Sequence, residues 1–220
     1  MKLKKKHRFI LAADGSAASG KTTGAKIISK KYGLKFLSSG LLYRFASYQL
    51  LKFKPQNKIK FLKLKFKKLN YNKLNKINLH SSKISEYTSI IAKQKKIRNI
   101  LKKFQKNFAS KHKKVCIEGR DIGTVILPKA DLKIFFICSL NVAAKRRYKE
   151  LKKKNKMVNF KNVKKELQKR NLRDVSRKNS PLLKSPDAVI VDTGKLKNIT
   201  MMVNNMCKIM DRKILDKYGN

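Results

Sequence analysis

The amino-acid sequence predicts a three-layer α/β fold, in which a five-stranded parallel sheet lies between helices on both faces. Apolar runs of strand length alternate with longer helical patterns along most of the 220 residues, and this alternation is typical of such sheets. A glycine-rich turn also joins the first apolar run to the first helical pattern. Sheets of this kind bind ligands beyond the carboxyl ends of their strands, so we expect the functional residues at that edge.

Five apolar segments are the expected strands, and helical patterns lie between them. The strands are expected at Phe9–Ala13, Val115–Ile117, Leu132–Cys138, Ala188–Asp192 and, more weakly, Leu34–Leu37. The helices are expected at Lys21–Tyr32, Leu41–Lys52, Ile90–Ser110, Val142–Lys154 and Val163–Val175. We therefore expect a single domain over residues 1–220, with its core at 7–52 and 88–220.

Two polar segments interrupt the alternation. Residues Phe53–Tyr87 are rich in lysine and asparagine and contain short alternating stretches. We expect a small inserted subdomain with weak strands at 53–87, and the alternative is a low-complexity, partly disordered loop. Lys152–Lys161 is a basic connection between two helical patterns, which indicates a mobile lid around residues 148–162.

The first expected strand leads into a stretch that fits the phosphate-binding loop pattern G-x-x-x-x-G-K-[ST]. It reads Gly15-Ser16-Ala17-Ala18-Ser19-Gly20-Lys21-Thr22. A strand that ends in such a loop and opens a helix directs several backbone N–H groups at one polyphosphate. The lysine of this pattern, Lys21, reaches the outer phosphates, and the Thr22 hydroxyl coordinates Mg²⁺. The stretch therefore predicts a P-loop fold that holds a nucleotide with Mg²⁺.

A second stretch follows another apolar run and contains two acids and an arginine among glycines. It reads Glu118-Gly119-Arg120-Asp121-Ile122-Gly123-Thr124. Acids are scarce in this chain, and from Gly15 to Ile117 the sole acid is Glu86. Yet several acids fall in or beside strand ends and motifs, namely Asp14, Glu118, Asp121, Asp174 and Asp192. This placement indicates that the acids bind Mg²⁺ and substrate. The two stretches together indicate an enzyme that transfers a phosphoryl group.

Arginines are concentrated in two further places. Arg170, Arg173, Asp174 and Arg177 have the spacing that would place three guanidiniums and one carboxylate on one helix face. Such a face is either a salt-bridged surface or a clamp for phosphates, whose oxygens match planar guanidiniums. The second place is a turn into a helix, with Ser39 as the expected N-cap and Arg44 one turn later.

The composition excludes several classes of protein. The apolar runs are far shorter than the roughly 18 residues of a membrane span. The basic Lys2–Arg8 and the apolar run after it resemble a signal peptide but lack its length and cleavage site, so we expect a cytoplasmic protein. Three cysteines without C-x-x-C spacing are expected to be core residues in a reducing compartment. The three isolated histidines indicate no metal cluster.

The net charge is extreme, because 58 Lys and Arg residues face 12 Asp and Glu, giving +46. One interpretation is binding to nucleic acid, since a positive field attracts phosphate backbones. The other is a lysine-rich composition spread over the whole solvated surface. The lysines are scattered along nearly the entire chain, without a basic tail or interleaved aromatic residues. This scatter favours the second interpretation, and we expect no specific nucleic-acid partner.

Taken in order, the motifs resemble those of the bacterial cytidylate kinase family, which makes CDP from CMP or dCMP with ATP. They are D-G-x-x-x-x-G-K-T, S-G-x-x-Y-R, E-G-R-D-I-G-T-V, R-R-Y-x-E-L and R-x-x-R-D-x-x-R. The resemblance covers nearly the whole chain and is weakest over Phe53–Tyr87. It implies a nucleoside monophosphate kinase with a small nucleotide-binding insert and a lid.

The resemblance also implies a role for each motif residue. The ATP phosphates would be held by Gly15, Ser16, Ala17, Ala18, Ser19, Gly20, Lys21, Thr22 and Thr23. The phosphate of CMP would be bound by Arg44, Arg120 and Arg177, with Ser39 beside the substrate. The cytosine edge would be read by Ser89, Arg98 and Asp121, and the sugar would face Arg170 and Asp174. Mg²⁺ would be bound by Thr22 and oriented by Glu118 through water. The catalytic cations would be Lys21, Arg120, Arg177 and, from the lid, Arg146 or Arg147.

Three features depart from the family pattern. Ser38 stands where the family usually has an acid, which could weaken the orientation of nucleotide or metal, although a serine still permits the turn. Ser16 replaces the usual proline, and the insert is shorter and more basic than usual. Two other functions stay open. One is a basic nucleic-acid-binding protein that uses the loop as a switch, and the other is a kinase acting on a hydroxyl, which would need a catalytic base. We expect a monomer whose partners are ATP and CMP or dCMP.

Overall fold

The computed structural model describes residues 3–153, 157–196 and 198–219 of the chain. The chain divides into two compact units, of which one comprises Met1–Leu37 and His112–Asn220 and the other Ser38–Lys111. The expected insert at 53–87 lies within the second unit. Its bounds, and those of the expected core, stay a prediction.

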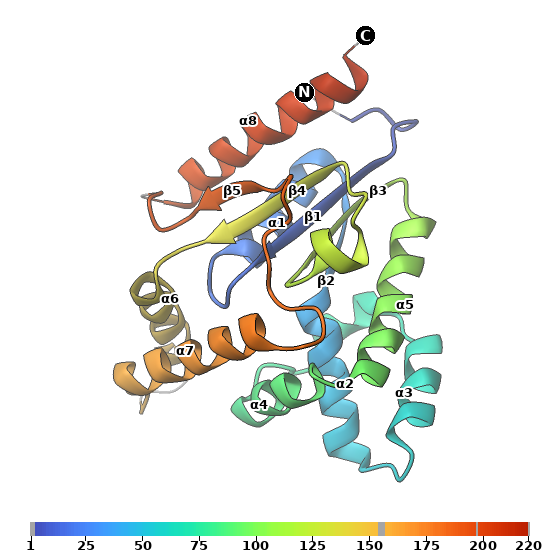
Figure 1. Cartoon of the computed structure of the whole chain (residues 1–220), viewed down its shortest axis with the longest axis vertical. Helices are drawn as coiled ribbons and strands as arrows, with labels where there is room; N and C mark the ends of the chain where they lie inside the picture. Colours follow the sequence, from blue (N-terminus) through green and yellow to red (C-terminus); the bar gives the residue numbers. More distant parts are fainter. Residues whose placement is uncertain (1–2, 154–156, 197, 220) are drawn as a thin grey trace. The chain divides into compact units, whose positions relative to one another are not determined.

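The first unit contains a five-stranded parallel sheet with the strand order β2-β3-β1-β4-β5 (Figure 1). The strands are β1 (Phe9–Gly15), β2 (Lys35–Ser38), β3 (Lys114–Gly119), β4 (Leu132–Ile137) and β5 (Val189–Asp192). All five were expected from the sequence, and the predicted α/β class is confirmed. Where β1 pairs with its neighbours, Asp14 lies opposite Gly119 and Gly15 lies opposite Phe136. The carboxyl ends of β1, β3 and β4 therefore lie side by side at one edge of the sheet.

The helices of this unit surround the sheet and include one that was not among the expected helices. They are α1 (Lys21–Tyr32), α6 (Leu140–Lys152), α7 (Phe160–Ser176) and α8 (Ile199–Tyr218), with a π-helical turn, η2, at Ile122–Ile126. Helix α8 was missed. It buries Met202, Met206, Met210 and Ile214, which follow one another at intervals of four residues. That interval is the period of one helix face, so a signal for α8 was present in the sequence.

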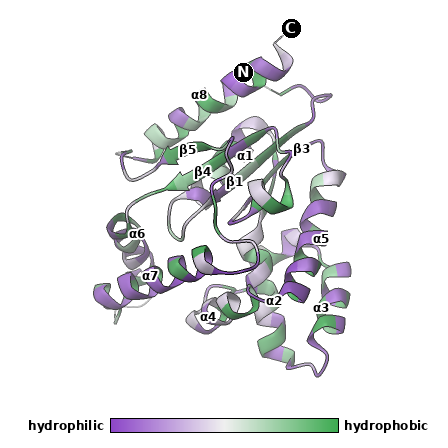
Figure 2. Cartoon of the chain, in the orientation of Figure 1, coloured by the Kyte–Doolittle hydropathy of each residue, from purple (hydrophilic) through white to green (hydrophobic). Residues whose placement is uncertain are grey.

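The main core lies between the sheet and the pair α1 and α8. Its fully buried side chains include Phe9, Leu11, Ile28, Phe136 and Met206. Figure 2 shows the corresponding pattern, with hydrophobic residues on the central strands and both kinds of residue alternating on the helices. Burial of this kind stabilises the sheet by roughly 1.5–3 kcal/mol for each large side chain. The core therefore holds the strand ends, and with them the turns at the edge, in fixed positions.

A smaller core lies beneath α6 and α7. It contains Ala17 from the phosphate loop together with Ala144, Val163 and Leu167 from the two helices. The expected lid around 148–162 connects these helices, and residues 154–156 of it lie outside the described residues. The lid thus stays a prediction.

The second unit is helical. Its elements are α2 (Ser39–Phe53), α3 (Lys58–Lys67), a 3₁₀ helix, η1 (Tyr71–Lys76), α4 (Ser82–Ile91) and α5 (Lys95–Lys111). The weak strands expected in 53–87 are wrong, because α3, η1 and most of α4 occupy that segment. Side chains of Asn57, Asn70 and Ser81 accept backbone N–H groups at the starts of these three helices, as N-cap residues do. Two of the asparagines that suggested a polar loop, Asn57 and Asn70, therefore act as helix caps.

An aromatic cluster helps to form the core of the second unit. Phe66 of α3 makes edge-to-face contacts with Phe45 of α2 and Phe104 of α5, both at ring-centroid distances of 5.7 Å. Leu62, one turn earlier on α3, is fully buried. This four-residue spacing is that of a helix, which explains why the polar insert folds as helices and not as strands.

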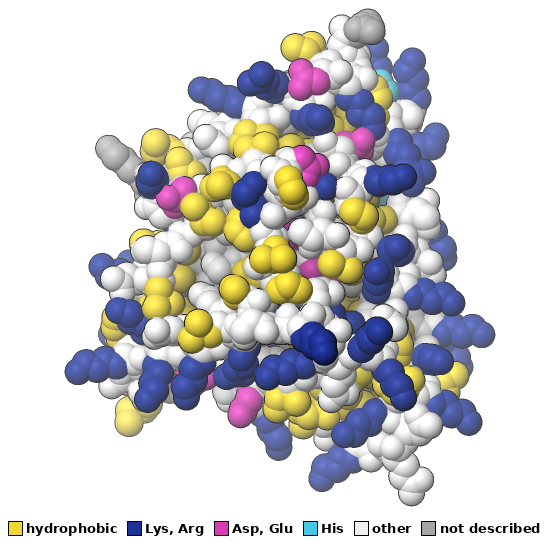
Figure 3. Space-filling view, in the orientation of Figure 1, with side chains coloured by type: hydrophobic (Ala, Val, Ile, Leu, Met, Phe, Trp, Pro, Cys, Tyr) yellow, Lys and Arg dark blue, Asp and Glu magenta, His cyan; other side chains and the backbone are white. Residues whose placement is uncertain are grey.

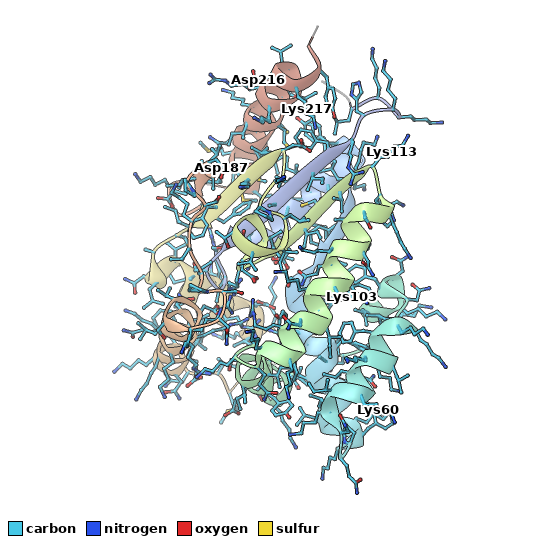
Figure 4. The ribbon with its side chains drawn as sticks, turned by 45° about the vertical axis from the view of Figure 1, so that its right-hand side comes forward. Lys60, Lys103, Lys113, Asp187, Asp216 and Lys217 are labelled. Atoms are coloured by element: carbon cyan, nitrogen blue, oxygen red, sulfur yellow. The ribbon has the colours of Figure 1, made fainter. Side chains whose placement is uncertain are left out.

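Charged side chains are dispersed over the surface. Figure 3 shows lysine and arginine side chains over elements of both units, without a single gathering place. The labelled Lys60, Lys103, Lys113 and Lys217 in Figure 4 likewise come from four different parts of the chain. Within the described residues, no helix combines the length and hydropathy needed to cross a membrane. The same residues contain no group of three His, Cys, Asp or Glu side chains placed to hold a metal ion.

Candidate active site

The phosphate loop connects β1 to α1 and depends on glycine. Gly15 has φ 153° and Gly20 has φ 80°, values that favour glycine. A Cβ atom at Gly15 would lie 2.3 Å from the carbonyl oxygen of Phe136, so the start of the loop can lie this close to β4 only with glycine there. Within the loop the Ser19 hydroxyl donates to the Ser16 carbonyl at 3.0 Å. The predicted strand, loop and helix are thus all present.

Contacts from other elements hold the loop in place. Asn171 of α7 accepts the backbone N–H of Ala17 at 3.2 Å. The hydroxyl of Thr193, directly after β5, donates to the Ser19 carbonyl at 2.9 Å. Sequence reasoning missed both side chains. The usable signal was that Thr193 directly follows an expected strand, at the edge where ligands bind.

Lys21 and Glu118 form a buried ion pair at the sheet edge. Lys21 begins α1 and Glu118 lies near the end of β3, and the Nζ to Oε2 distance is 3.6 Å. Both side chains are more than nine-tenths buried. Burial, and secondarily the charge of Arg120, lowers the pKa of Lys21 to about 8, which Glu118 partly opposes. A cation and a carboxylate therefore stand directly beside the loop, and Thr22 and Thr23 are exposed next to them.

The carboxylate of Asp14 connects β1 to the turn after β3. It accepts the backbone N–H of Ile122 at 2.9 Å and that of Gly123 at 2.7 Å. Both groups belong to η2, directly after Arg120 and Asp121. Burial raises the pKa of Asp14 to about 6, although the two N–H groups oppose this shift. Asp121 itself is buried.

Asp174 of α7 gathers two of the predicted arginines. Its carboxylate contacts Arg120 Nε at 2.8 Å and Arg177 Nη1 at 3.5 Å. Burial acts to raise the pKa of Asp174, but Arg120 foremost, then Arg170 and Arg177, hold it below its usual value. Helix α7 ends at Ser176, so Arg177 approaches from the residue after the helix and not from the predicted common face. Asp174 thus contacts Arg177 and also Arg120, and the predicted phosphate clamp that includes Arg170 and Arg173 stays a prediction.

The two arginines that were predicted to act from the lid are placed differently. Arg146 of α6 donates from Nη1 to the Thr193 hydroxyl and from Nη2 to the Thr193 carbonyl, both at 2.8 Å. A Cβ atom at Gly20 would lie 3.6 Å from Arg146 Nη1, which places this guanidinium beside the phosphate loop. Arg147 pairs with Glu150 on its own helix at 2.9 Å.

Four predicted site residues belong to the second unit. Arg44 of α2 donates from Nη1 to the Leu79 carbonyl at 3.1 Å and to the Ser85 hydroxyl at 2.7 Å. Ser39 is buried at the start of the same helix. The expectation that Ser39 is the N-cap is wrong by one residue, because the Ser38 hydroxyl accepts the Leu41 N–H at 3.3 Å. Ser38 thus caps helix α2 at the position where the family usually has an acid.

The other two are Arg98 and Ser89. Arg98 of α5 is 7% exposed, donates to the Ala92 carbonyl at 3.0 Å and lies over the Tyr43 ring at 5.7 Å. Ser89 of α4 donates to the Glu86 carbonyl at 2.7 Å. A buried guanidinium held by a carbonyl and an aromatic face has a fixed orientation, as a recognition residue requires.

Comparisons with known proteins identify the family of the chain. Residues 11–212 match the family model described as cytidylate kinase. The chain is 35% identical to a cytidylate kinase of Clostridium tetani, covering 96% of this chain and 98% of that protein. It is 37% identical to one of Thermosipho melanesiensis, covering 92% and 97%.

A solved structure supports the fold alone. An uncharacterized protein from Eubacterium ventriosum superposes with a TM-score of 0.55 at 17% identity, covering 93% of this chain and 99% of that chain. The phosphate loop, the Glu118–Gly123 turn and the matched relatives over nearly the whole length lead to one conclusion: this chain belongs to the cytidylate kinase family.

Proposed function

We propose that the chain transfers the γ-phosphoryl group of ATP to CMP or dCMP, giving ADP and CDP or dCDP, with the residue roles set out below. The observation that carries these roles is the register of β1 and β3, which places the phosphate loop beside the turn of Arg120 and Asp121. One strand end would hold the donor phosphates and its neighbour the acceptor. Both activity and family are those of the matched relatives.

The reaction needs positioning and charge neutralisation more than proton transfer. The acceptor is a phosphate oxygen that is already an anion, so no general base is required. Lys21 and the loop N–H groups hold the ATP phosphates, while Arg120 and Arg177 bind the CMP phosphate together with Arg44. Because the two substrates are held in line, the entropic cost of orienting them is met by binding and not at the chemical step. The negative charge on the transferring group is stabilised by the fixed cations.

The residues around the loop fit Mg²⁺. This ion prefers oxygen ligands and keeps several of its waters, and Thr22 and Glu118 offer a hydroxyl and a carboxylate. Bound there, Mg²⁺ would supply charge to the phosphate oxygens. Glu118, buried against Lys21, would orient the ion through water, and Thr22 would ligate it directly.

We further propose that cytosine is recognised by Asp121, Ser89 and Arg98. The Asp121 carboxylate would accept from the exocyclic amine that uracil lacks, while Arg98 and Ser89 contact the other edge atoms. Arg170 and Asp174 would face the sugar, with Ser39 beside the substrate. The burial of Asp121 and Arg98 supports this role, since buried polar groups discriminate strongly against a base that leaves them unpaired.

Arg146 is proposed as the catalytic arginine of the lid. Its contact with Thr193 and its approach to Gly20 favour it over Arg147, which pairs with Glu150. Closure of residues 148–162 would exclude water and suppress hydrolysis of ATP. The protein is proposed to act in the cytoplasm as a monomer. Sedimentation at several protein concentrations would test the monomeric state.

Turnover of four acceptors tests the function. ADP release is measured with CMP, dCMP, UMP and AMP at equal concentrations, with and without Mg²⁺. CMP or dCMP is expected to react fastest, and only with the metal present. Equal or faster turnover of UMP or AMP would contradict the cytosine roles. Release of ADP without any acceptor would indicate an ATPase instead.

A further inference from the structure

Asp14 lies between the two halves of the proposed site but belongs to neither. It immediately precedes Gly15 of the phosphate loop, and its side chain is turned away from the loop sequence toward the turn after β3. The residue is 5% exposed. Its Oδ1 accepts the Ile122 N–H and its Oδ2 the Gly123 N–H, at 2.9 and 2.7 Å. Each carboxylate oxygen therefore accepts one backbone hydrogen bond.

The turn needs this carboxylate because of how η2 begins. The first N–H groups of any helical turn lack a partner within that turn. In η2 the intrahelical bonds start with the N–H groups of Val125 and Ile126, both donated to the Asp121 carbonyl. The N–H groups of Ile122 and Gly123 are left over, and Asp14 accepts both. A single buried side chain thus caps the first two N–H groups of η2.

Gly123 lies in a crowded position beside the capped turn. A Cβ atom there would lie 3.1 Å from Lys133 Cδ and 3.4 Å from Asp14 Oδ2. The first distance requires Lys133 to move, while its Nζ is held by Ser185 and Asp187, at 3.2 and 3.0 Å. Glycine at this position therefore leaves room for Lys133 beside the capped start of η2.

The two residues before the capped groups are Arg120 and Asp121. Their backbone is fixed on one side by the pairing of β3 with β1 and on the other by the cap. We propose that Asp14 is a positioning residue of the phosphoryl transfer, which sets the acceptor-binding Arg120 and Asp121 relative to the donor-binding loop. This inference rests on the proposed roles of Arg120 and Asp121. Asp14 itself touches neither substrate in this proposal.

Asp14→Asn tests the inference, since asparagine keeps the shape but offers one acceptor in place of two. The amide group then opposes one of the N–H groups of η2. We expect the KM for CMP to rise at least about fivefold and kcat to fall by about tenfold to a hundredfold, the scale of a misplaced reacting group. The KM for ATP should change less than twofold, because the loop backbone does not use the carboxylate.

Asp131→Asn is the matched control. Asp131 Oδ2 accepts the Ile10 N–H at 2.7 Å, so it too holds the backbone of a neighbouring segment, at the other end of β1. This variant should lose thermal stability without change in either KM or in kcat per folded molecule. If both variants lower kcat equally, or if Asp14→Asn leaves the KM for CMP and kcat within twofold, Asp14 is not a positioning residue.

A structural readout separates this inference from the proposed function. Amide hydrogen exchange of Ile122 and Gly123 should accelerate at least about tenfold in Asp14→Asn and stay unchanged in Asp131→Asn. Gly123→Ala, whose Cβ would press on Lys133 beside the capped turn, provides a second variant if Asp14→Asn does not fold. It should show the same rise in the KM for CMP. Accelerated exchange with normal CMP binding would overturn the positioning role while leaving the kinase function intact.

Discussion

At the scale of single residues, the few acids of the chain act at the edge of the sheet. Asp14 caps a turn, Glu118 contacts Lys21, and Asp174 holds Arg120. The scarcity of acids made their importance predictable from the sequence. Their partners were not predictable, because they lie 108 residues away for Asp14 and 54 for Asp174. Only the fold brings such distant residues together.

Lys21→Ala removes the cation closest to the loop. Turnover of CMP should fall at least about a hundredfold, the scale on which one charge stabiliser of a transition state acts. Lys26→Ala, an exposed lysine of the same helix, is the control and should remain within twofold of the parent. A coupled assay of ADP release measures both. Near-normal turnover of the first variant would remove Lys21 from the site.

The pH dependence of stability should reveal Asp14. Its pKa is raised from 3.8 to about 6 by burial and by Asp121, against Lys21 and the two N–H groups. The folded protein therefore binds this proton more tightly than the unfolded chain does. Protonated Asp14 therefore contributes about 3 kcal/mol to the free energy of unfolding. This contribution is fully present below about pH 4 and is lost as the pH rises through 6.

Asp14→Asn removes this titration. Urea unfolding between pH 4 and 7 should show a decline in the parent that the variant lacks. Asp174 has the opposite sign, because its pKa is lowered, and its contribution is lost only as the pH falls below about 4. A flat parent profile from pH 4 to 7, or an identical slope in Asp14→Asn, would refute the raised pKa.

At the scale of elements, hydrophobic periodicity predicted all strands and most helices, since most of these elements bury apolar side chains. The prediction from periodicity failed in two places.

In 53–87 the alternation of lysine with apolar residues imitated strands, whereas burial of Leu62 and Phe66 selects a helix. Helix α8 was missed although its buried side chains recur every four residues. At the site, the loop and turn were predictable as motifs, but the supports from Asn171 and Thr193 come from elsewhere in the chain.

Helix α8 should stabilise the first unit through its methionines. Met206 is fully buried, whereas Met201 on the same helix is 43% exposed. Met206→Ala should lower the free energy of unfolding by about 2–5 kcal/mol, the usual cost of such a cavity. Met201→Ala should cost less than about 0.5 kcal/mol. Equal effects in urea unfolding would show that α8 does not contribute its buried face to the core.

At the scale of the whole molecule, the charge of +46 should oppose folding. Like charges destabilise a compact state through self-repulsion, and salt screens them beyond about 10 Å at 0.1 M. The melting temperature should therefore rise by several degrees between about 0.01 and 0.3 M NaCl. A melting temperature that is constant or falls with salt would contradict net repulsion.

The same charge predicts weak binding to RNA that depends on salt. Because the lysines are dispersed over many elements (Figures 3 and 4), filter binding should be indifferent to sequence and vanish by about 0.15 M salt. RNA binding that persists at this salt with a preferred sequence would instead support a nucleic-acid function.

β5 stands at one end of the strand order and is four residues long. Its Val189 and Ile190 are 39% and 51% exposed. Sheet edges of this kind pair with edges of other molecules, and short edge strands and nearby lysines oppose that pairing. The cationic surface is therefore expected to act as a colloidal barrier that keeps copies of the enzyme apart in a crowded solution. A polyanion that coats this surface should remove the barrier and allow β5 to self-associate.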